Sequence, residues 1–138
     1  MKELTVGKVV QLDKRDAKLA MAFMHVAFIA LLIGGLCGLL QVLERAGIMT
    51  LPLGIGYYQL LTAHGVLLAL VFTTYFIYGF LFAGLSKTMG TFKDNVRKIA
   101  WIGYWVLTLG TLLAAILIIL GRANVLYTFY APLQADPF

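Results

Sequence analysis

The chain has 138 residues, of which 62% are hydrophobic and 12% are charged. Soluble domains carry about one quarter charged residues, so this composition excludes a soluble globular protein and predicts an integral membrane protein. The net charge of +5 does not indicate nucleic-acid binding, because the basic residues gather in two short segments beside apolar runs, where membrane proteins need them.

Residues 1–18 form a basic flank that carries five of the eleven Lys and Arg residues. No apolar stretch follows a short basic start, so this flank is not a cleavable signal peptide. The apolar run at 19–43 predicts the first membrane helix, which Glu44, Arg45 and Gly47 end. A short connection that contains glycine and proline leads to the next apolar run.

The second predicted membrane helix extends from Tyr57 to about Gly84, a stretch of 28 residues without Lys, Arg, Asp or Glu. An α-helix rises about 1.5 Å per residue, so this segment exceeds the ~30 Å thickness of the hydrocarbon core of a bilayer. A loop with four basic residues and one acid follows at 86–98, and residues 99–120 predict a third membrane helix. The tail after it is rich in aromatic residues.

The distribution of the basic residues predicts how these helices cross the membrane. The N-terminal flank and the second loop hold nine Lys and Arg, whereas the first loop and the tail hold one each, Arg45 and Arg122. The positive-inside rule then puts the flank and the second loop in the cytoplasm. We therefore expect an all-α integral membrane fold with three transmembrane helices, a cytoplasmic N-terminus and a C-terminus outside.

His64 is a titratable side chain inside the second apolar segment, about 10 Å from its outer end at the α-helical rise. Lipid offers an imidazole no hydrogen-bond partner, so His64 must face protein, water or a metal. Its neighbours Ala63 and Gly65 are small, which lets a planar group approach the backbone. From the residues alone, a hydrogen bond to another helix and a role as metal ligand are about equally supported.

The first predicted helix contains Gly34 and Gly38, four residues apart on one face. This spacing favours close helix packing, and the alternative is room for the edge of a macrocycle. His25 lies near the inner end of the same helix, where a histidine usually bonds a backbone carbonyl or interfacial water. His25 and His64 are about 18 Å apart along the membrane normal, whereas two axial nitrogens on one iron lie about 4 Å apart, so they cannot share one haem.

Two stretches of the sequence are distinctive: GYYQLLTAHGVLLALVFT at residues 56–73 and ANVLYTFYAPLQADP at residues 123–137. The first resembles the second helix of subunit I of the haem-copper oxygen reductases, and it looks closest to the B-type, the ba-type cytochrome c oxidases. The second resembles the segment after the third helix of that subunit, with Ala131-Pro132 where the family usually has two prolines. The resemblance implies that residues 19–138 form the first three helices of a fold of about twelve.

The resemblance implies roles for three residues. His64 would be an axial ligand of the low-spin haem, expected to be of b type, and Tyr127 and Tyr130 would lie near the haem propionates on the outer side. The implied function is part of a proton-pumping terminal oxidase that reduces oxygen to water in aerobic respiration. In the family, later helices bind the high-spin haem and copper, so this chain alone would lack the binuclear centre and be inactive, with no catalytic residue of its own.

The implied partners are the remainder of subunit I, as a continuation of the chain or as a complementing chain, oxidase subunit II, and cytochrome c or a similar electron donor. The implied location is the plasma membrane of a bacterium or archaeon. Three alternatives stay open. They are a catalytically inactive haem-binding or structural membrane protein, a relative of the nitric oxide reductases, and a bundle without haem in which His64 only bonds a neighbouring helix.

Overall fold

The computed structural model describes residues 12–51, 55–126 and 135, and its regular elements within these ranges are all helices. In chain order they are α1 (Lys14–Arg45), α2 (Tyr57–Gly65), the π-helix η1 (Val66–Phe72), α3 (Thr73–Met89) and α4 (Asp94–Ile119). α2, η1 and α3 continue into one another, and we refer to Tyr57–Met89 as the second long helix. Three helices of the described chain are therefore long and apolar enough to span a membrane, as the sequence predicted.

The helices extend beyond the predicted apolar runs because their polar ends are helical too. α1 begins at Lys14 rather than near residue 19, and Asp13 caps it by accepting a hydrogen bond from the backbone N–H of Arg15. α3 continues past Gly84 to Met89, and α4 begins at Asp94, inside the segment predicted to be a loop. Part of the basic flank and of the second loop is thus helix.

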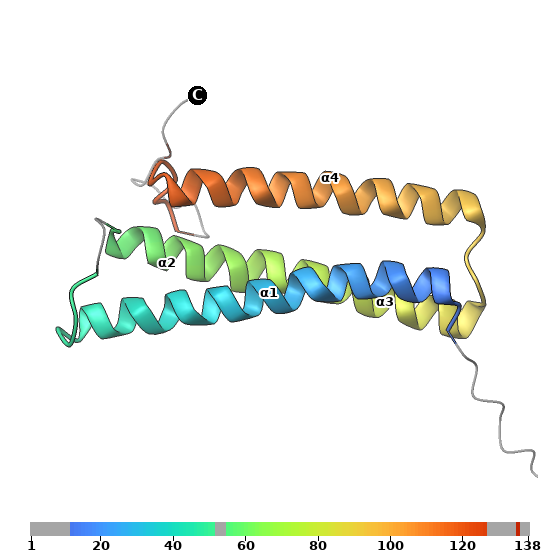
Figure 1. Ribbon diagram of the computed structural model, residues 1–138, viewed down its shortest axis with the longest axis horizontal. Coiled ribbons are helices and arrows are strands. Elements are labelled where there is room, and N and C mark those ends of the chain that lie inside the picture. The colour runs from blue at the N-terminus through green and yellow to red at the C-terminus, as the bar shows by residue number, and fades with distance from the viewer. Residues whose placement is uncertain (1–11, 52–54, 127–134, 136–138) are drawn as a thin grey trace, which may run out of the picture.

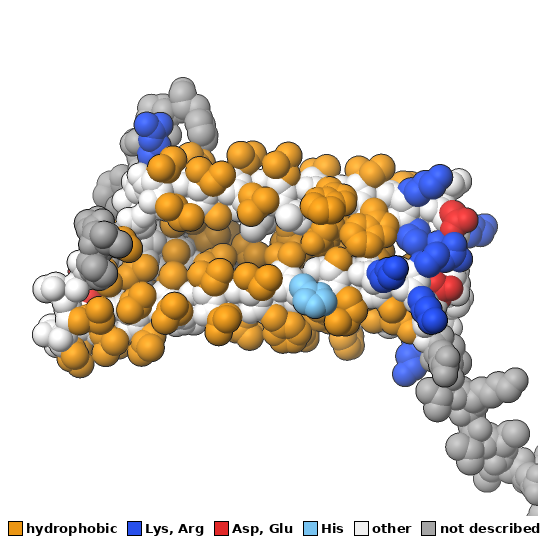
Figure 2. Space-filling model, in the orientation of Figure 1, with side chains coloured by type: hydrophobic (Ala, Val, Ile, Leu, Met, Phe, Trp, Pro, Cys, Tyr) orange, Lys and Arg blue, Asp and Glu red, His pale blue; other side chains and the backbone are white. Residues whose placement is uncertain are grey.

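Successive long helices run antiparallel, so α1 and α4 run in the same direction and the second long helix runs opposite to both (Figure 1). α1 packs along α2, η1 and α3, and α4 lies beside them with most of its large apolar side chains exposed. The start of α1, the end of α3 and the start of α4 meet at one end, where Lys and Arg side chains gather, while apolar side chains cover the middle (Figure 2). This pattern fits helices that cross a bilayer with their basic ends at one face.

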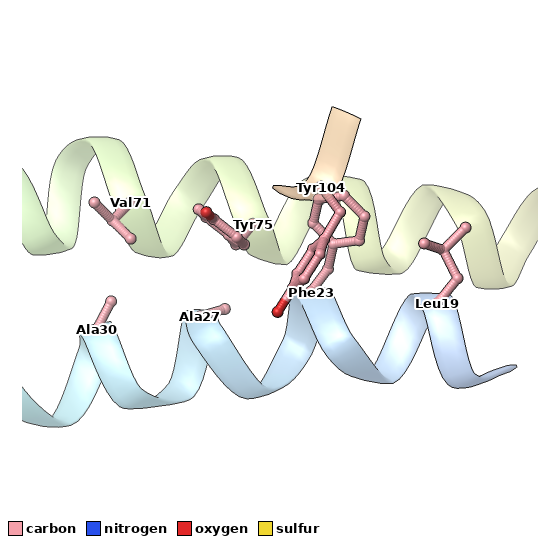
Figure 3. Packing of buried hydrophobic residues seen from close by; sticks show 7 residues of the cluster. All are labelled: Leu19, Phe23, Ala27, Ala30, Val71, Tyr75 and Tyr104. Carbon is pink, nitrogen blue, oxygen red and sulfur yellow. The ribbon is translucent and has the colours of Figure 1, made fainter. Parts of the chain in front are cut away.

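Small residues on α1 let the second long helix come close. Val71 lies opposite Ala30, and Tyr75 lies opposite Ala27 (Figure 3). Phe23 meets the edge of Tyr104 from α4, with the ring centroids 5.0 Å apart. Because lipid tails are as apolar as these side chains, close van der Waals packing of this kind is what holds membrane helices together.

Candidate functional site

His64 lies near the C-terminal end of α2 and is half-buried against α1. Its Nδ1 is 2.8 Å from the backbone oxygen of Gly34. A carbonyl oxygen only accepts hydrogen bonds, so Nδ1 carries the proton and donates it, and the lone pair of the neutral ring lies on Nε2. Within the described parts of the chain, Nε2 makes no hydrogen bond, so it is available to a ligand.

Two glycines of α1 make room for this part of the second long helix. A Cβ atom on Gly38 would lie 2.5 Å from Nδ1 of His64, and one on Gly34 would lie 2.9 Å from Leu68 and 3.0 Å from Leu67. These distances are shorter than side chains tolerate, so helix packing explains both glycines, as predicted. The alternative of room for a macrocycle edge is wrong at these positions, because His64 and the two leucines fill the space.

Within the described residues, His64 is not part of a metal-ion site built from the side chains of this chain. No three His, Cys, Asp or Glu side chains in the described ranges gather as a metal-ion site. A haem needs only axial ligands from the protein, because the macrocycle supplies the other four. A ligating histidine usually donates its second ring N–H to a carbonyl, and Gly34 accepts such a bond here. The hydrogen bond between helices and the ligand role are therefore compatible.

His25 lies elsewhere on α1, and its Nδ1 is 2.6 Å from the backbone oxygen of Met21 in the same helix. This confirms the expectation that His25 bonds a backbone carbonyl. Gly34, which contacts His64, is nine residues further along α1, or about 14 Å at the α-helical rise. The structure thus keeps the two histidines apart. Tyr127 and Tyr130 lie outside the described residues.

An ion pair at the basic end of the bundle was not predicted from the sequence. Asp16 is fully buried, and its Oδ1 accepts a hydrogen bond from Nε of Arg97 at 2.8 Å. Its Oδ2 accepts from Oγ of Ser86 at 2.6 Å and from the backbone N–H of Phe92 at 3.0 Å. One carboxylate therefore joins the start of α1, the end of α3 and the start of α4.

The signal for this pair was present in the sequence. Asp16 precedes the first apolar run by three residues, and Arg97 precedes the third by two. In a three-helix antiparallel bundle the first and third helices begin at the same face. An acid and a base at equal depth there could have been predicted to meet.

A cavity of about 320 Å³ lies between the second long helix, α1 and α4, and apolar side chains form nearly all of its wall. His64 is not among the residues that line this cavity, so we do not assign the cavity to a group bound at Nε2 of His64.

Hydrogen bonds hold α4 to the second long helix beside this cavity. Nε2 of Gln59, one of the lining residues, donates to the backbone oxygens of Ile118 and Ile119, both at 2.8 Å. Deeper in the bundle, the hydroxyl of Tyr75 donates to Oγ1 of Thr108 at 3.0 Å. These bonds tie α4 to the second long helix.

Comparison with known proteins identifies the family of this bundle. The family model described as Cytochrome C and Quinol oxidase polypeptide I matches residues 18–138. The chain belongs to this family. Over 126 residues it is 32% identical to cytochrome c oxidase subunit 1 of Thermus thermophilus, and the match covers 86% of this chain. The cryo-EM structure of a heme-copper terminal oxidase dimer matches 90% of the chain with a TM-score of 0.80 and 37% identity.

These matches confirm the resemblance to subunit I of the haem-copper oxidases and the all-α membrane fold. The chain spans 22% of the length of the Thermus protein and 21% of the solved oxidase chain. The family match extends through every helix described above, apart from the first turn of α1. The roles of individual residues, and the activity of a whole enzyme, are therefore taken up as proposals.

Proposed function

We propose that this chain is part of subunit I of a B-type haem-copper oxidase, which reduces oxygen to water in aerobic respiration, and that His64 is an axial ligand of its low-spin haem. The observation that carries the proposal is the bond from Nδ1 of His64 to the Gly34 carbonyl, which leaves Nε2 for iron. It occurs in a chain of the oxidase family, inside the stretch that resembles the second helix of subunit I.

When bound, a low-spin haem supplies one-electron transfer. The role of this chain is to hold the imidazole of His64 in one tautomer and one orientation. The Gly34 carbonyl fixes the proton on Nδ1 and makes Nε2 a stronger donor. Gly38 leaves room for the ring, since any side chain there would collide with it.

The rest of the machinery lies, in this proposal, outside this chain. A second axial histidine, the high-spin haem and copper would come from the remainder of subunit I, and subunit II and cytochrome c or a similar donor would deliver electrons. The proposed location is the plasma membrane of a bacterium or archaeon, with the basic end of the bundle in the cytoplasm. The gathering of Lys and Arg at that end supports this orientation (Figure 2).

We keep the proposal that Tyr127 and Tyr130 lie near the haem propionates. The backbone N–H of Leu126, the residue before Tyr127, donates to Oγ1 of Thr62 at 3.0 Å. Thr62 precedes His64 by two residues, so the chain reaches the His64 end of the second long helix just before the first of these tyrosines. This position of Leu126 supports the proposal that Tyr127 and Tyr130 approach a haem bound at His64.

The proposal is tested in the assembled oxidase that contains this chain. His64→Ala should abolish the low-spin haem absorbance and electron delivery, because it removes the imidazole that the Gly34 carbonyl orients. His25→Ala is the matched control and should leave both unchanged, since His25 bonds only its own helix. A purified complex without a Soret band would instead support a structural membrane protein without haem.

A further inference from the structure

α1 and α4 are joined directly in only one half of the described bundle. In the basic half, Asp16 of α1 binds Arg97 of α4, and the ring of Phe23 meets the ring of Tyr104. In the other half no hydrogen bond joins the described residues of α1 to those of α4, and the cavity of about 320 Å³ lies there, between these two helices and the second long helix. The surface in this half is hollowed between α4 and α1 (Figure 2).

The cavity extends from the end of the bundle opposite the basic end to the middle of the bundle. Gln59 and Ile119 line its outer end, and Val71 and Thr111 line its inner end. Gln59 and Val71 are twelve positions apart, or about 18 Å at the α-helical rise. One leaflet contributes about 15 Å to the hydrocarbon core of a bilayer. The cavity is therefore elongated and matches the depth of one leaflet, as an acyl chain does.

The wall of the cavity offers a ligand almost no hydrogen-bond partner. Besides the thiol of Cys37, its polar side chains are those of Gln59 and Thr111. The Gln59 amide is bonded to backbone oxygens at the end of α4 and to the backbone N–H of Gly56. The Thr111 hydroxyl donates to the backbone oxygen of Leu107. Since a buried water needs two to four polar partners, this cavity suits an apolar ligand and not water.

Positive charge lies beyond the outer end of the cavity, at the ends of the two helices that flank it. Arg45 is the last residue of α1, and Arg122 lies three positions after the end of α4. Both side chains are exposed, and Glu44 is the one acid at this end among the described residues. Arginines at this level attract the phosphate of a lipid headgroup. The acyl chain below such a headgroup lies at the depth of the cavity.

We propose that this cavity binds one acyl chain of a phospholipid from the leaflet opposite the basic end, with the phosphate at the level of Arg45 and Arg122. The acyl chain fills the space between Cys37 of α1 and Ala115 of α4. It thereby holds α4 to α1 in the half of the bundle where no hydrogen bond between their described residues does. His64 does not line the cavity, so the proposal does not rest on a haem at His64.

Two neighbouring alanines of α4 provide a matched test. Ala115 lines the cavity, whereas Ala114 is exposed and does not line it. The assembled oxidase is purified in mild detergent with added phosphatidylglycerol, and its bound phospholipids are counted by native mass spectrometry. Ala115→Phe should retain one phospholipid fewer than the parent protein, because the ring occupies the cavity, and Ala114→Phe should retain the parent number. Equal retention in Ala115→Phe and the parent would overturn the proposal.

A second test locates the acyl chain in the parent oxidase, so it also decides if Ala115→Phe does not assemble. The probe is phosphatidylglycerol with a photoreactive diazirine in the middle of one acyl chain, in nanodiscs that contain the oxidase. After illumination, peptide mass spectrometry should find the lipid attached to Cys37 or Ala115. Adducts on other membrane helices but none on the residues that line the cavity would show that another part of the oxidase fills it, and would contradict the proposal.

These measurements separate the lipid site from the proposed haem ligand. His64→Ala should change the haem spectrum and leave the number of bound phospholipids as in the parent, whereas Ala115→Phe should lower that number. A low-spin spectrum that survives His64→Ala, with adducts still on Cys37, supports the lipid site and contradicts the ligand role. A quinone extracted from the purified oxidase, bound in place of the phospholipid that Ala115→Phe displaces, would overturn the assignment of a phospholipid.

Discussion

At the scale of single residues, His64 shows how a polar side chain is made acceptable inside an apolar bundle. One ring nitrogen is satisfied by the Gly34 carbonyl of a neighbouring helix, and the other makes no hydrogen bond within the described residues. The sequence identified His64 as the residue that needs an explanation, and it indicated a helix-packing role for Gly34 and Gly38. It could not show that the glycines and the histidine belong to one contact, because that depends on how the two helices are paired.

Gly38→Ala tests this contact. The new Cβ would lie 2.5 Å from Nδ1 of His64, so the ring must move, at a cost of about 1–3 kcal/mol for overpacking. We expect a loss of low-spin haem from the assembled oxidase. Gly35→Ala is the matched control, because a Cβ there meets nothing within 4 Å, and it should retain the parent spectrum. Equal haem content in the two variants would show that Gly38 does not position the ring.

At the scale of the elements, the apolar runs of the sequence predicted three helices, and the structure confirms them. The π-helical pattern of Val66–Phe72 was not predicted, because VLLALVF suits α-helix and π-helix equally in composition. The helix ends also differ from the prediction, since charged residues such as Asp16 and Arg97 continue the helices and pair with each other.

The pair between Asp16 and Arg97 should stabilise the helix ends. Asp16→Ala removes the buried partner of Arg97 and the acceptor for Ser86 and the Phe92 N–H, and it leaves the guanidinium with only the exposed Asp94 carboxylate and the Phe92 carbonyl. We expect a clearly lower thermal denaturation midpoint of the purified complex. Asp94→Ala, whose side chain is 71% exposed, removes a weaker partner of the same arginine and should cost less than about 1 kcal/mol. Similar midpoints for the two variants would argue against a stabilising role of the buried carboxylate.

At the scale of the whole molecule, the uneven distribution of charge agrees with the antiparallel packing of successive helices, because that packing brings the basic segments together at one end of the bundle. The loops at one end of the bundle are basic, and the helices that meet there are joined by Asp16. The sequence predicted that asymmetry directly, since nine of the eleven Lys and Arg residues lie in two segments. A site shared with other parts of a larger subunit could not be predicted from this chain, because the second ligand and the haem enclosure would come from elsewhere.

Cysteine labelling in intact cells tests the orientation. In a Cys37→Ser background, a cysteine at Ile48 should react with a membrane-impermeant reagent, because this residue is 73% exposed and lies at the end proposed to face outward. A cysteine at the exposed Thr91 should react only after the cells are opened. The reverse pattern would show that the basic end faces outward.

The most direct measurement of the central claim is the EPR and optical spectrum of the assembled oxidase with His64→Gly. Removing the imidazole should abolish the low-spin signal, and added free imidazole should restore it, because the small ligand can occupy the space that the ring leaves beside Gly34 and Gly38. A six-coordinate, bis-histidine spectrum in His64→Gly before imidazole is added would contradict the assignment of His64 as the axial ligand.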